Sequence, residues 1–348
     1  MPTTDLLIVG HGLAGATLAW QARWRGLSVA VADRGGVDRA GRPSASRVAA
    51  GLITPITGKR LTLAGSFEPQ REAAVDHYRR VEQETGVTVL HEAAALRLFQ
   101  SSDERQRFAY RQRDAAHARH ANLADTLPPA LDDEDGAFWM PHAARLDTRR
   151  YLDASTARLQ HEGRFFAEEL DPRTELTITP AGVEAPKLNL QARAVCLCQG
   201  YDPTLPDWLA ALPFAPAKGE VLRVRAPRLD VRHVVHRGLW LVPGEATGSA
   251  NEYLVGSTYE WDRLDSTPTE SAREELLDGL ASLTPTPVEV IDHQAAVRPA
   301  TASREPLVGI GPTDPPVAWL NGLGAKGSLL APWHAGRLAR RLADRLSI

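Results

Sequence analysis

Three glycines near the start of the chain have the spacing of a turn that binds a phosphate group. A predicted strand over Asp5–Gly10 precedes them, and a predicted helix over Leu13–Arg25 follows. The first glycine permits the tight turn, the second lets a phosphate approach the backbone, and the third lets helix and strand pack closely. The helix N-terminus offers free N–H groups to an anion. We therefore expect the pyrophosphate of a dinucleotide to be bound by Gly10, Gly12, Leu13, Ala14 and Gly15.

An acidic residue stands where such a dinucleotide site needs one. The predicted strand Ser28–Ala32 ends at Asp33, 23 residues after Gly10, and its carboxylate can accept hydrogen bonds from the ribose hydroxyls. The same charge repels a 2′-phosphate, so NADP is disfavoured, and we expect Arg34 to contact the cofactor too. His11, inside the turn, is expected to face solvent, with a contact to the cofactor as the alternative. This combination of a strand, glycines, a helix and an acidic residue binds FAD and NAD equally well. The alternative is that the glycines form an ordinary tight turn without a ligand.

Composition and charge narrow the class of protein. The 348 residues are 43% hydrophobic and 24% charged, with a formal net charge of -3 and a pI near 6.4, which give no basic field for nucleic acid. No apolar run reaches the roughly 18 residues of a membrane span, and the N-terminus has no export signal, so we expect a cytoplasmic protein. Cys196 and Cys198 lie on one predicted strand. We expect them to face opposite ways, buried and unbridged, rather than to form a metal or redox pair.

The predicted elements alternate between strands and helices at both ends of the chain, which is typical of a doubly wound α/β sheet. The middle differs, because residues 218–261 have the alternating pattern of antiparallel strands, including one predicted over Val231–Val242. A charged helix is predicted over Asp103–Ala121 and a strand over Arg164–Leu170. After the last predicted strand, Val317–Leu320, three glycines precede a helix that runs to about residue 345.

Three further segments, far apart in the sequence, make a more specific pattern. The first is Ser46-Arg47-Val48-Ala49-Ala50-Gly51-Leu52. The second is Val297-Arg298-Pro299 followed by Pro306-Leu307-Val308-Gly309, and the third is Gly322-Leu323-Gly324-Ala325-Lys326-Gly327. Together they resemble the flavin-passing segment, the Leu-Arg-Pro…Pro-x-Ile-Gly segment and the C-terminal flavin loop of the FAD-dependent D-amino-acid oxidase and glycine oxidase family. Smaller similarities are Lys218-Gly219-Glu220 and Val255-Gly256-Ser257-Thr258.

This resemblance implies a fold and a cofactor. The expected fold is α/β, a Rossmann-like FAD-binding domain with an inserted α+β substrate domain, as in D-amino-acid oxidase. The FAD-binding domain would comprise residues 1–60, 146–212 and 290–348, and the substrate-binding domain residues 61–145 and 213–289. FAD would be bound non-covalently, because the cysteine that attaches flavin in some relatives is absent near the C-terminal loop. The residues expected at the FAD site, beyond those of the opening unit, are Ser46, Ala49, Ala50, Gly51, Leu52, Gly200, Gly322, Gly324, Ala325, Lys326 and Gly327.

Two residues are expected to act on the substrate. The resemblance implies that Arg298 holds a substrate carboxylate with its guanidinium fork. An ion pair with Asp292 or Glu305 is the structural alternative. Trp240 stands where glycine oxidase has a substrate-contacting tyrosine, and a place in the core is the alternative. The lost hydroxyl makes glycine a doubtful substrate.

Three cations have open roles. Lys59 and Arg60 lie just beyond the flavin-passing segment, where they would receive an acidic side chain of the substrate or belong to a solvated loop. Lys326 would lie beside the flavin or point outward.

The chemistry that the resemblance implies is oxidation of the carbon–nitrogen bond of an amino acid or related carboxylated amine. Hydride would pass to flavin N5, an imine would form, and oxygen or another acceptor would take the electrons, without a metal or a protein nucleophile. One alternative is the oxidase of 5-methylaminomethyl-uridine modification in tRNA, whose substrate is a secondary amine with a carboxymethyl arm; the acidic pI disfavours nucleic acid. Two further alternatives are a subunit that binds FAD without catalysing a reaction and an NAD-linked dehydrogenase.

Overall fold

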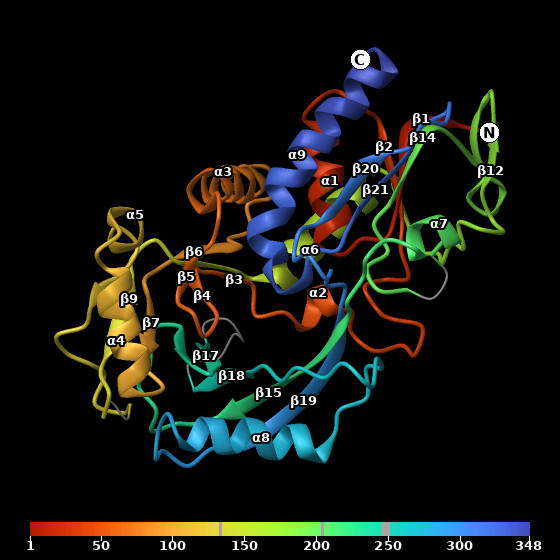
Figure 1. Cartoon of the computed structure of the whole chain (residues 1–348). Coiled ribbons are helices and arrows are strands. Elements are labelled where there is room, and N and C mark those ends of the chain that lie inside the picture. The colour runs from red at the N-terminus through yellow and green to blue at the C-terminus, as the bar shows by residue number, and fades with distance from the viewer. Residues whose placement is uncertain (132–133, 203–204, 245–250) are drawn as a thin grey trace.

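The structure is a computed structural model that describes residues 1–131, 134–202, 205–244 and 251–348 (Figure 1). Its first large sheet forms around β1, whose Leu6, Leu7 and Ile8 are fully buried, as a parallel strand covered on both faces requires. β1 pairs in parallel with β2 and β14, and β14 pairs in parallel with β21. The strands of this sheet are β1 (Thr3–Val9), β2 (Val29–Ala32), β11 (Phe165–Phe166), β12 (Thr177–Thr179), β13 (Gly182–Ala185), β14 (Leu190–Leu197), β20 (Leu307–Ile310) and β21 (Val317–Asn321).

Helices from both ends of the chain pack on this sheet. The first and last helices lie side by side in Figure 1 and contact one another, and α3 packs on the last helix. Their small and aliphatic residues, such as Ala16, Ala335 and Leu338, share one buried cluster with β1 and β2. The helices are α1 (Leu13–Arg23), α2 (Ala45–Val48), α3 (Phe67–Thr85), α4 (Ser102–Arg111), α5 (Ala115–Ala118), α6 (Thr148–His161), α7 (Asp207–Ala210), α8 (Glu270–Ala281) and α9 (Gly327–Leu346), with 3-10 turns at Pro186–Leu188 and Gly324–Lys326.

The second large sheet is mainly antiparallel and has the order β19-β15-β18-β17-β16-β7-β9-β8. One of its faces packs on α8, where Leu222 and Val224 meet Leu276 and Leu280 in a second buried cluster. Its other face is turned toward the first sheet. Its strands are β7 (Ala95–Leu98), β8 (Asn122–Leu123), β9 (Ala137–Met140), β15 (Ala217–Arg225), β16 (Val235–Arg237), β17 (Leu239–Pro243), β18 (Glu252–Gly256) and β19 (Glu289–Arg298).

Short strands connect the two regions. The residues that follow α2 form β3, which pairs with β10, and β10 pairs with β6. The next residues along the chain form a small hairpin of β4 and β5. Among the described residues, no helix is long and apolar enough to cross a membrane. The bounds of these strands are β3 (Leu52–Ile53), β4 (Ile56–Thr57), β5 (Thr62–Leu63), β6 (Leu90–Glu92) and β10 (Ala144–Leu146).

The α/β fold class predicted from the sequence is confirmed, but several local predictions were wrong. The helix predicted over Asp103–Ala121 is interrupted, because the Asp114 carboxylate accepts the N–H of Ala116 and starts α5 anew. The strand predicted over Val231–Val242 is instead the hairpin of β16 and β17, turning at Gly238, which has a φ of 73°. Of the strand predicted over 164–170, only the two residues of β11 pair with β2.

Two further differences concern β19 and the cysteines. β19 was missed from the sequence, and the predicted division places residues 290–348 with the FAD-binding part, whereas β19 pairs with β15 of the second sheet. The prediction that Cys196 and Cys198 face opposite ways was wrong, since residues two apart on a strand share a face. Their sulfurs are 3.8 Å apart, and both thiols are buried and unbridged.

Candidate active site

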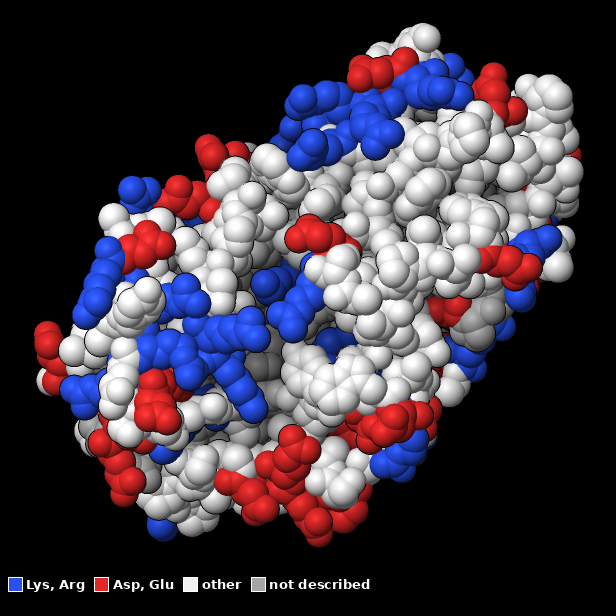
Figure 2. Space-filling model, in the orientation of Figure 1, with Lys and Arg blue, Asp and Glu red and all other residues white. Residues whose placement is uncertain are grey.

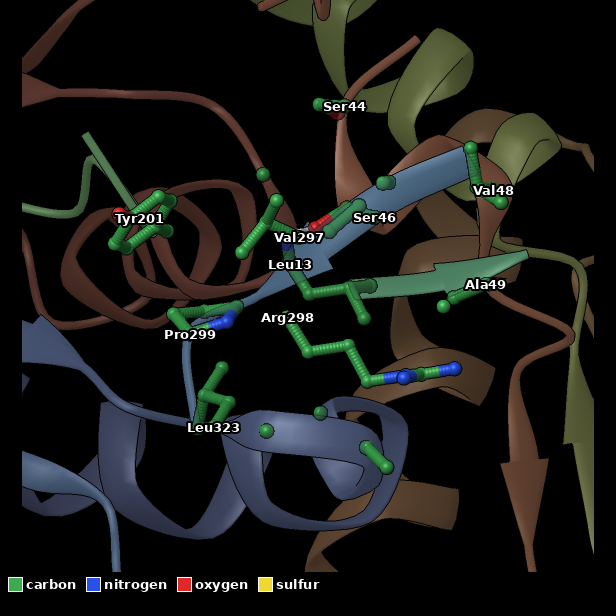
Figure 3. A pocket seen from close by; sticks show the side chains of 18 of the residues that line it. Leu13, Ser44, Ser46, Val48, Ala49, Tyr201, Val297, Arg298, Pro299 and Leu323 are labelled. Carbon is green, nitrogen blue, oxygen red and sulfur yellow. Dashed lines mark hydrogen bonds between the residues drawn. The ribbon is translucent and has the colours of Figure 1, made fainter. Parts of the chain in front are cut away.

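A cavity of about 740 Å³ lies between the two large sheets, at the carboxyl ends of β1, β2 and β14. Open α/β sheets bind their ligands at this edge. Residues from distant parts of the chain reach the cavity together, as Figure 3 shows for the turn after β1, α2, β19 and the loop before α9. The described residues labelled there are Leu13, Ser44, Ser46, Val48, Ala49, Tyr201, Val297, Arg298, Pro299 and Leu323.

Nearly all the residues predicted to form the site line this one cavity. The exceptions are two glycines whose role is packing. A Cβ on Gly15 would lie 1.9 Å from the carbonyl oxygen of Gly10, and a Cβ on Gly322 would lie 2.8 Å from the side chain of Thr301. The predicted residues that line the cavity are Gly10, Gly12, Leu13, Ala14, Asp33, Arg34, Ser46, Ala49, Ala50, Gly51, Leu52, Gly200, Trp240, Arg298, Gly324, Ala325, Lys326 and Gly327.

The turn after β1 has the form that a pyrophosphate requires. Gly10 has a φ of 98°, and a Cβ there would lie 2.6 Å from the carbonyl oxygen of Cys198. A Cβ on Gly12 would lie 2.8 Å from the Ser46 hydroxyl, which accepts the N–H of Leu13 at 3.0 Å. The hydroxyl and the first N–H of α1 therefore lie together at the cavity wall. This arrangement fits a bound phosphate group.

Asp33 is held rigidly at the same end of the cavity. Its Oδ2 accepts the N–H of His11 at 2.7 Å, and its Oδ1 accepts the N–H of Gly36 at 2.6 Å. The next residue, Arg34, donates to the Asp202 carboxylate at 2.8 Å. The Asp33 carboxylate thus lies against the glycine turn just before α1, the arrangement in which it can reach ribose hydroxyls.

His11 does not face solvent, so that expectation was wrong. Its side chain is buried, its Nδ1 lies 3.3 Å from the Thr156 hydroxyl, and its ring meets Phe165 edge-on. Burial lowers the pKa of His11 to about 4, with Arg47 lowering it further against the opposing charge of Asp33. The imidazole is therefore neutral at neutral pH. Its buried Nε2 has no hydrogen-bond partner within the described residues, and it lines the cavity.

Two other segments complete the predicted cofactor end. Gly51 has a φ of 75°, and a Cβ there would lie 1.9 Å from the carbonyl oxygen of Leu146, so only glycine fits this approach. At the far end of the chain, a Cβ on Gly327 would lie 3.0 Å from the Leu13 side chain, so the N-termini of α1 and α9 meet at the cavity. Both helices therefore present a partial positive charge to the same space.

Arg298 extends from the end of β19 into the cavity (Figure 3). Its Nη2 donates to the Ser257 hydroxyl at 2.7 Å and to the Thr258 carbonyl at 3.3 Å, and its Cζ lies 4.3 Å from the centre of the Tyr259 ring. A Cβ on Gly219 would lie 1.8 Å from the guanidinium, so this glycine makes its room. Burial lowers the pKa of Arg298.

The guanidinium of Arg298 has no carboxylate partner among the described residues. The ion pairs with Asp292 and Glu305 that the sequence left open do not form: Asp292 accepts instead from the side chain of Gln294. A largely buried cation that is held by a hydroxyl, two carbonyl oxygens and an aromatic ring, without an anion, has the chemistry that fits an anionic ligand.

Trp240 both packs and lines the cavity. It stands on β17 with its indole over Gly256, where a Cβ would lie 2.5 Å from the ring, and it packs against the buried cluster of Val48, Val221 and Ala296. Lysines stand nearby. Lys59 is exposed at the cavity and Lys326 lines it with a pKa that burial lowers, whereas Arg60 is exposed and does not line it.

Sequence reasoning did not single out several residues that the structure brings to this site. Ser257 and Gly219 were noted only as small similarities, and Tyr259 could not be placed on either face of its strand. Arg97 and His236 were not considered. No sequence signal marked Arg97, His236 or Tyr259. Gly219 and Gly256 lie in the segments noted as small similarities, and they leave room for the predicted residues Arg298 and Trp240.

Comparisons with known proteins agree with this geometry. The sequence matches the family described as FAD dependent oxidoreductase (DAO) over residues 5–341. A glycine oxidase of Pseudomonas aeruginosa is 25% identical, over 98% of this chain and 95% of that protein. The tRNA 5-methylaminomethyl-2-thiouridine biosynthesis bifunctional protein MnmC of Marinobacter nauticus is 25% identical over 99% of this chain, which spans about half (56%) of that relative.

Among solved structures, glycine oxidase from Bacillus cereus superposes with a TM-score of 0.82 at 19% identity, over 98% of this chain and 95% of that one. This likeness establishes the shared fold. The family match extends over nearly the whole sequence, including the glycine turn and the loop before α9. The chain therefore belongs to the DAO family of FAD-dependent oxidoreductases, and its cofactor is FAD.

Proposed function

We propose that this protein oxidises the carbon–nitrogen bond of an amino acid or related carboxylated amine. The observation that carries the proposal is the Arg298 guanidinium, a cation in the cavity without a carboxylate partner among the described residues. The glycine oxidase relative, whose name specifies an amino acid as substrate, supports it. A substrate carboxylate would supply the missing anion.

The residues of the chain would act mainly by orientation. Arg298 would bind the carboxylate in a bidentate fashion, while Ser257 and Tyr259 hold the guanidinium in place. Trp240 would form an apolar wall beside the substrate. FAD, when bound, supplies the two-electron acceptor that takes hydride from the α-carbon. With the substrate amine in its neutral form, the nitrogen lone pair would form the carbon–nitrogen double bond as hydride leaves, so this step requires no protein base. Correct orientation is worth several orders of magnitude in rate.

Positive charge near the loop before α9 would aid the reduction. The N-terminus of α9 and the Lys326 ammonium would stabilise the negative charge that reduction adds to the cofactor. The pKa of Lys326 is lowered by burial and by Arg304, partly offset by Glu305. Oxygen or another acceptor would then remove the electrons, and water would hydrolyse the imine.

The test is anaerobic titration of the FAD-loaded protein with amino acids of both enantiomeric series and N-alkylglycines, with flavin absorbance as the readout. At least one carboxylated amine should bleach the flavin. The same amine without its carboxylate should react about 100-fold less efficiently, the effect of about 3 kcal/mol from one buried charge-assisted contact. If dithionite bleaches the flavin and no carboxylated amine does, the proposal fails and a non-catalytic FAD-binding subunit is favoured.

A second candidate is an oxidase that acts on a modified uridine of tRNA, suggested by the similarity to the tRNA-modifying relative. Lys and Arg side chains gather beside the cavity over β4 and β5 (Figure 2), where Arg107 donates to the carbonyl oxygen of Lys59. Against this, Figure 2 also shows acidic side chains over α8 on the opposite rim. Filter binding of bulk tRNA at two salt concentrations separates the candidates, because binding to phosphates weakens steeply with salt.

A further inference from the structure

One row of residues crosses the cavity-facing side of the second sheet. In the register of the strands, Arg97 of β7 stands beside His236 of β16, His236 beside Trp240 of β17, and Trp240 beside Gly256 of β18. Residues that stand opposite one another on neighbouring strands share a face of the sheet. All but Gly256 line the cavity, and the row ends next to Ser257, which binds Arg298.

The far end of this row is polar. Arg97 is fixed by hydrogen bonds to the Gly58 carbonyl at 3.0 Å and the Glu104 carboxylate at 2.6 Å. His236 has a buried Nε2 without a hydrogen-bond partner in the described ranges. Burial lowers the pKa of His236 to about 3, with Arg97 adding to the effect. The imidazole is therefore neutral and can donate one N–H to a ligand.

Gly238 has no side chain, and this leaves room for the Gln100 amide at this end of the cavity. A Cβ there would lie 2.5 Å from the amide nitrogen of Gln100. Gln100, Gly238 and the exposed Lys59 all line the same cavity as Arg298. The turn at Gly238, which interrupts the strand predicted there, thus lets the Gln100 amide lie at the cavity wall.

The charges along the cavity are divided between its two ends. At the Arg97 end, Glu104 balances one cation and Lys59 adds another. The described carboxylates that line the cavity lie elsewhere, and Asp265 among them is bound to Lys218 at 2.9 Å. The other carboxylates that line the cavity come from the segments that follow β2, β11 and β14 of the first sheet, and they are Asp33, Asp38, Glu168, Glu169 and Asp202.

We propose that Arg97, His236, Gln100 and Lys59 form a distal subsite that binds a second acidic group, a carboxylate or phosphate, on the amine substrate. The inference rests on the proposed function, in which Arg298 binds the first carboxylate. Three strand spacings of about 4.8 Å separate β7 from β18, so about 14 Å of sheet lies between the two ends before the side chains reach inward. The preferred substrates are therefore amines whose two acidic groups are joined by a chain of several atoms, with Trp240 packing against that chain.

The experiment compares acids with their matched neutral amides. The probes are glutamate and glutamine, 2-aminoadipate and its ω-amide, N-carboxyalkylglycines and N-alkylglycines, and amino acids with a terminal phosphonate, each tested as both enantiomers where they exist. The measurement is kcat/KM with an artificial electron acceptor. At the best chain length, the acid should exceed its amide at least tenfold, and the phosphonate arm distinguishes phosphate from carboxylate recognition.

Variants then connect the preference to the subsite. Lys59→Ala and His236→Phe should each reduce the acid-to-amide ratio at least fivefold, and His236→Asn should restore part of it through its amide N–H. Arg60→Ala is the matched control, because Arg60 is also exposed, neighbours Lys59 and does not line the cavity. It should leave the ratio unchanged.

The outcomes separate this inference from the function on which it rests. Equal kcat/KM for acid and amide at every chain length overturns the distal subsite and leaves carbon–nitrogen oxidation standing. A strong preference that survives both Lys59→Ala and His236→Phe also overturns the subsite. Reduction of the flavin by none of the amines overturns the proposed function, and the subsite falls with it.

Discussion

The two ends of the cavity are built in different ways. The cofactor end comes largely from one short stretch of chain, in which β1, the glycine turn, α1 and Asp33 follow one another within thirty-odd residues. The substrate end is assembled from β7, β17, β18 and β19, whose residues are up to about two hundred positions apart. The dinucleotide-binding turn is therefore a local feature of the sequence, whereas the substrate end depends on how distant strands pair.

The ends also differ in how their charged groups are satisfied. Asp33 is fixed by two backbone N–H groups, so its position follows from the turn itself. Arg298 is fixed by the Ser257 hydroxyl and the Tyr259 ring, which lie in the segment after β18, and it has no carboxylate partner among the described residues. The position of Asp33 should therefore tolerate changes in the second sheet, whereas the position of Arg298 should not. Variants at each end should therefore affect different measurements.

The largest effect is expected at the substrate end, for Arg298→Ala. Loss of the guanidinium removes the charge-assisted contact to the substrate carboxylate, so kcat/KM should fall about 1,000-fold, or about 4 kcal/mol. FAD content, read from the flavin spectrum of the purified protein, should stay near that of the unaltered chain. Arg60→Ala is the control. Near-normal kcat/KM with a confirmed substrate would show that Arg298 does not bind the carboxylate.

At the cofactor end, Gly12→Val should act on FAD binding. A Cβ at this position would lie 2.8 Å from the Ser46 hydroxyl, and the added methyl groups would occupy the space where a phosphate approaches the backbone. The Kd for FAD, measured by flavin fluorescence, should rise about 100-fold, or about 3 kcal/mol. Gly65→Ala is the matched control, because a Cβ there meets no atom within 4 Å. Unchanged FAD affinity for Gly12→Val would remove the turn from the cofactor site.

A smaller effect is expected for Gly219→Ala, which displaces Arg298 without removing it. The new Cβ would lie 1.8 Å from the guanidinium, so the side chain must leave its contact with Ser257. We expect kcat/KM to fall about 20-fold, mainly through KM, with FAD content preserved. Gly65→Ala again serves as the control. If activity stays at the control level, the position of the guanidinium is less critical than its geometry indicates.

The comparison explains what the sequence could predict. Gly10, Gly12 and Asp33 could be assigned because strand, turn and acid have a fixed spacing along the chain. The contacts of Arg298 could not be predicted, because β19 was not recognised in the sequence. The register of β19 with β15 determines that Gly219 lies under the guanidinium. His11 was misplaced for a related reason. Its burial depends on Phe165, more than 150 residues away, and no local pattern reports such a contact.

The smallest expected effect is a pH dependence of stability at the cofactor end. Burial lowers the pKa of His11 to about 4, whereas an unfolded histidine titrates near 6.5. Below about pH 6.5 the unfolded chain therefore binds a proton that the folded chain does not, so the stability that neutral His11 contributes is present above that pH and is lost as pH falls toward 4. Between pH 7 and pH 5.5 the loss should be about 1 kcal/mol. Urea unfolding of the FAD-loaded protein should give a shallower pH dependence for His11→Gln. Parallel curves would mean that His11 titrates with the same pKa in the folded and the unfolded chain.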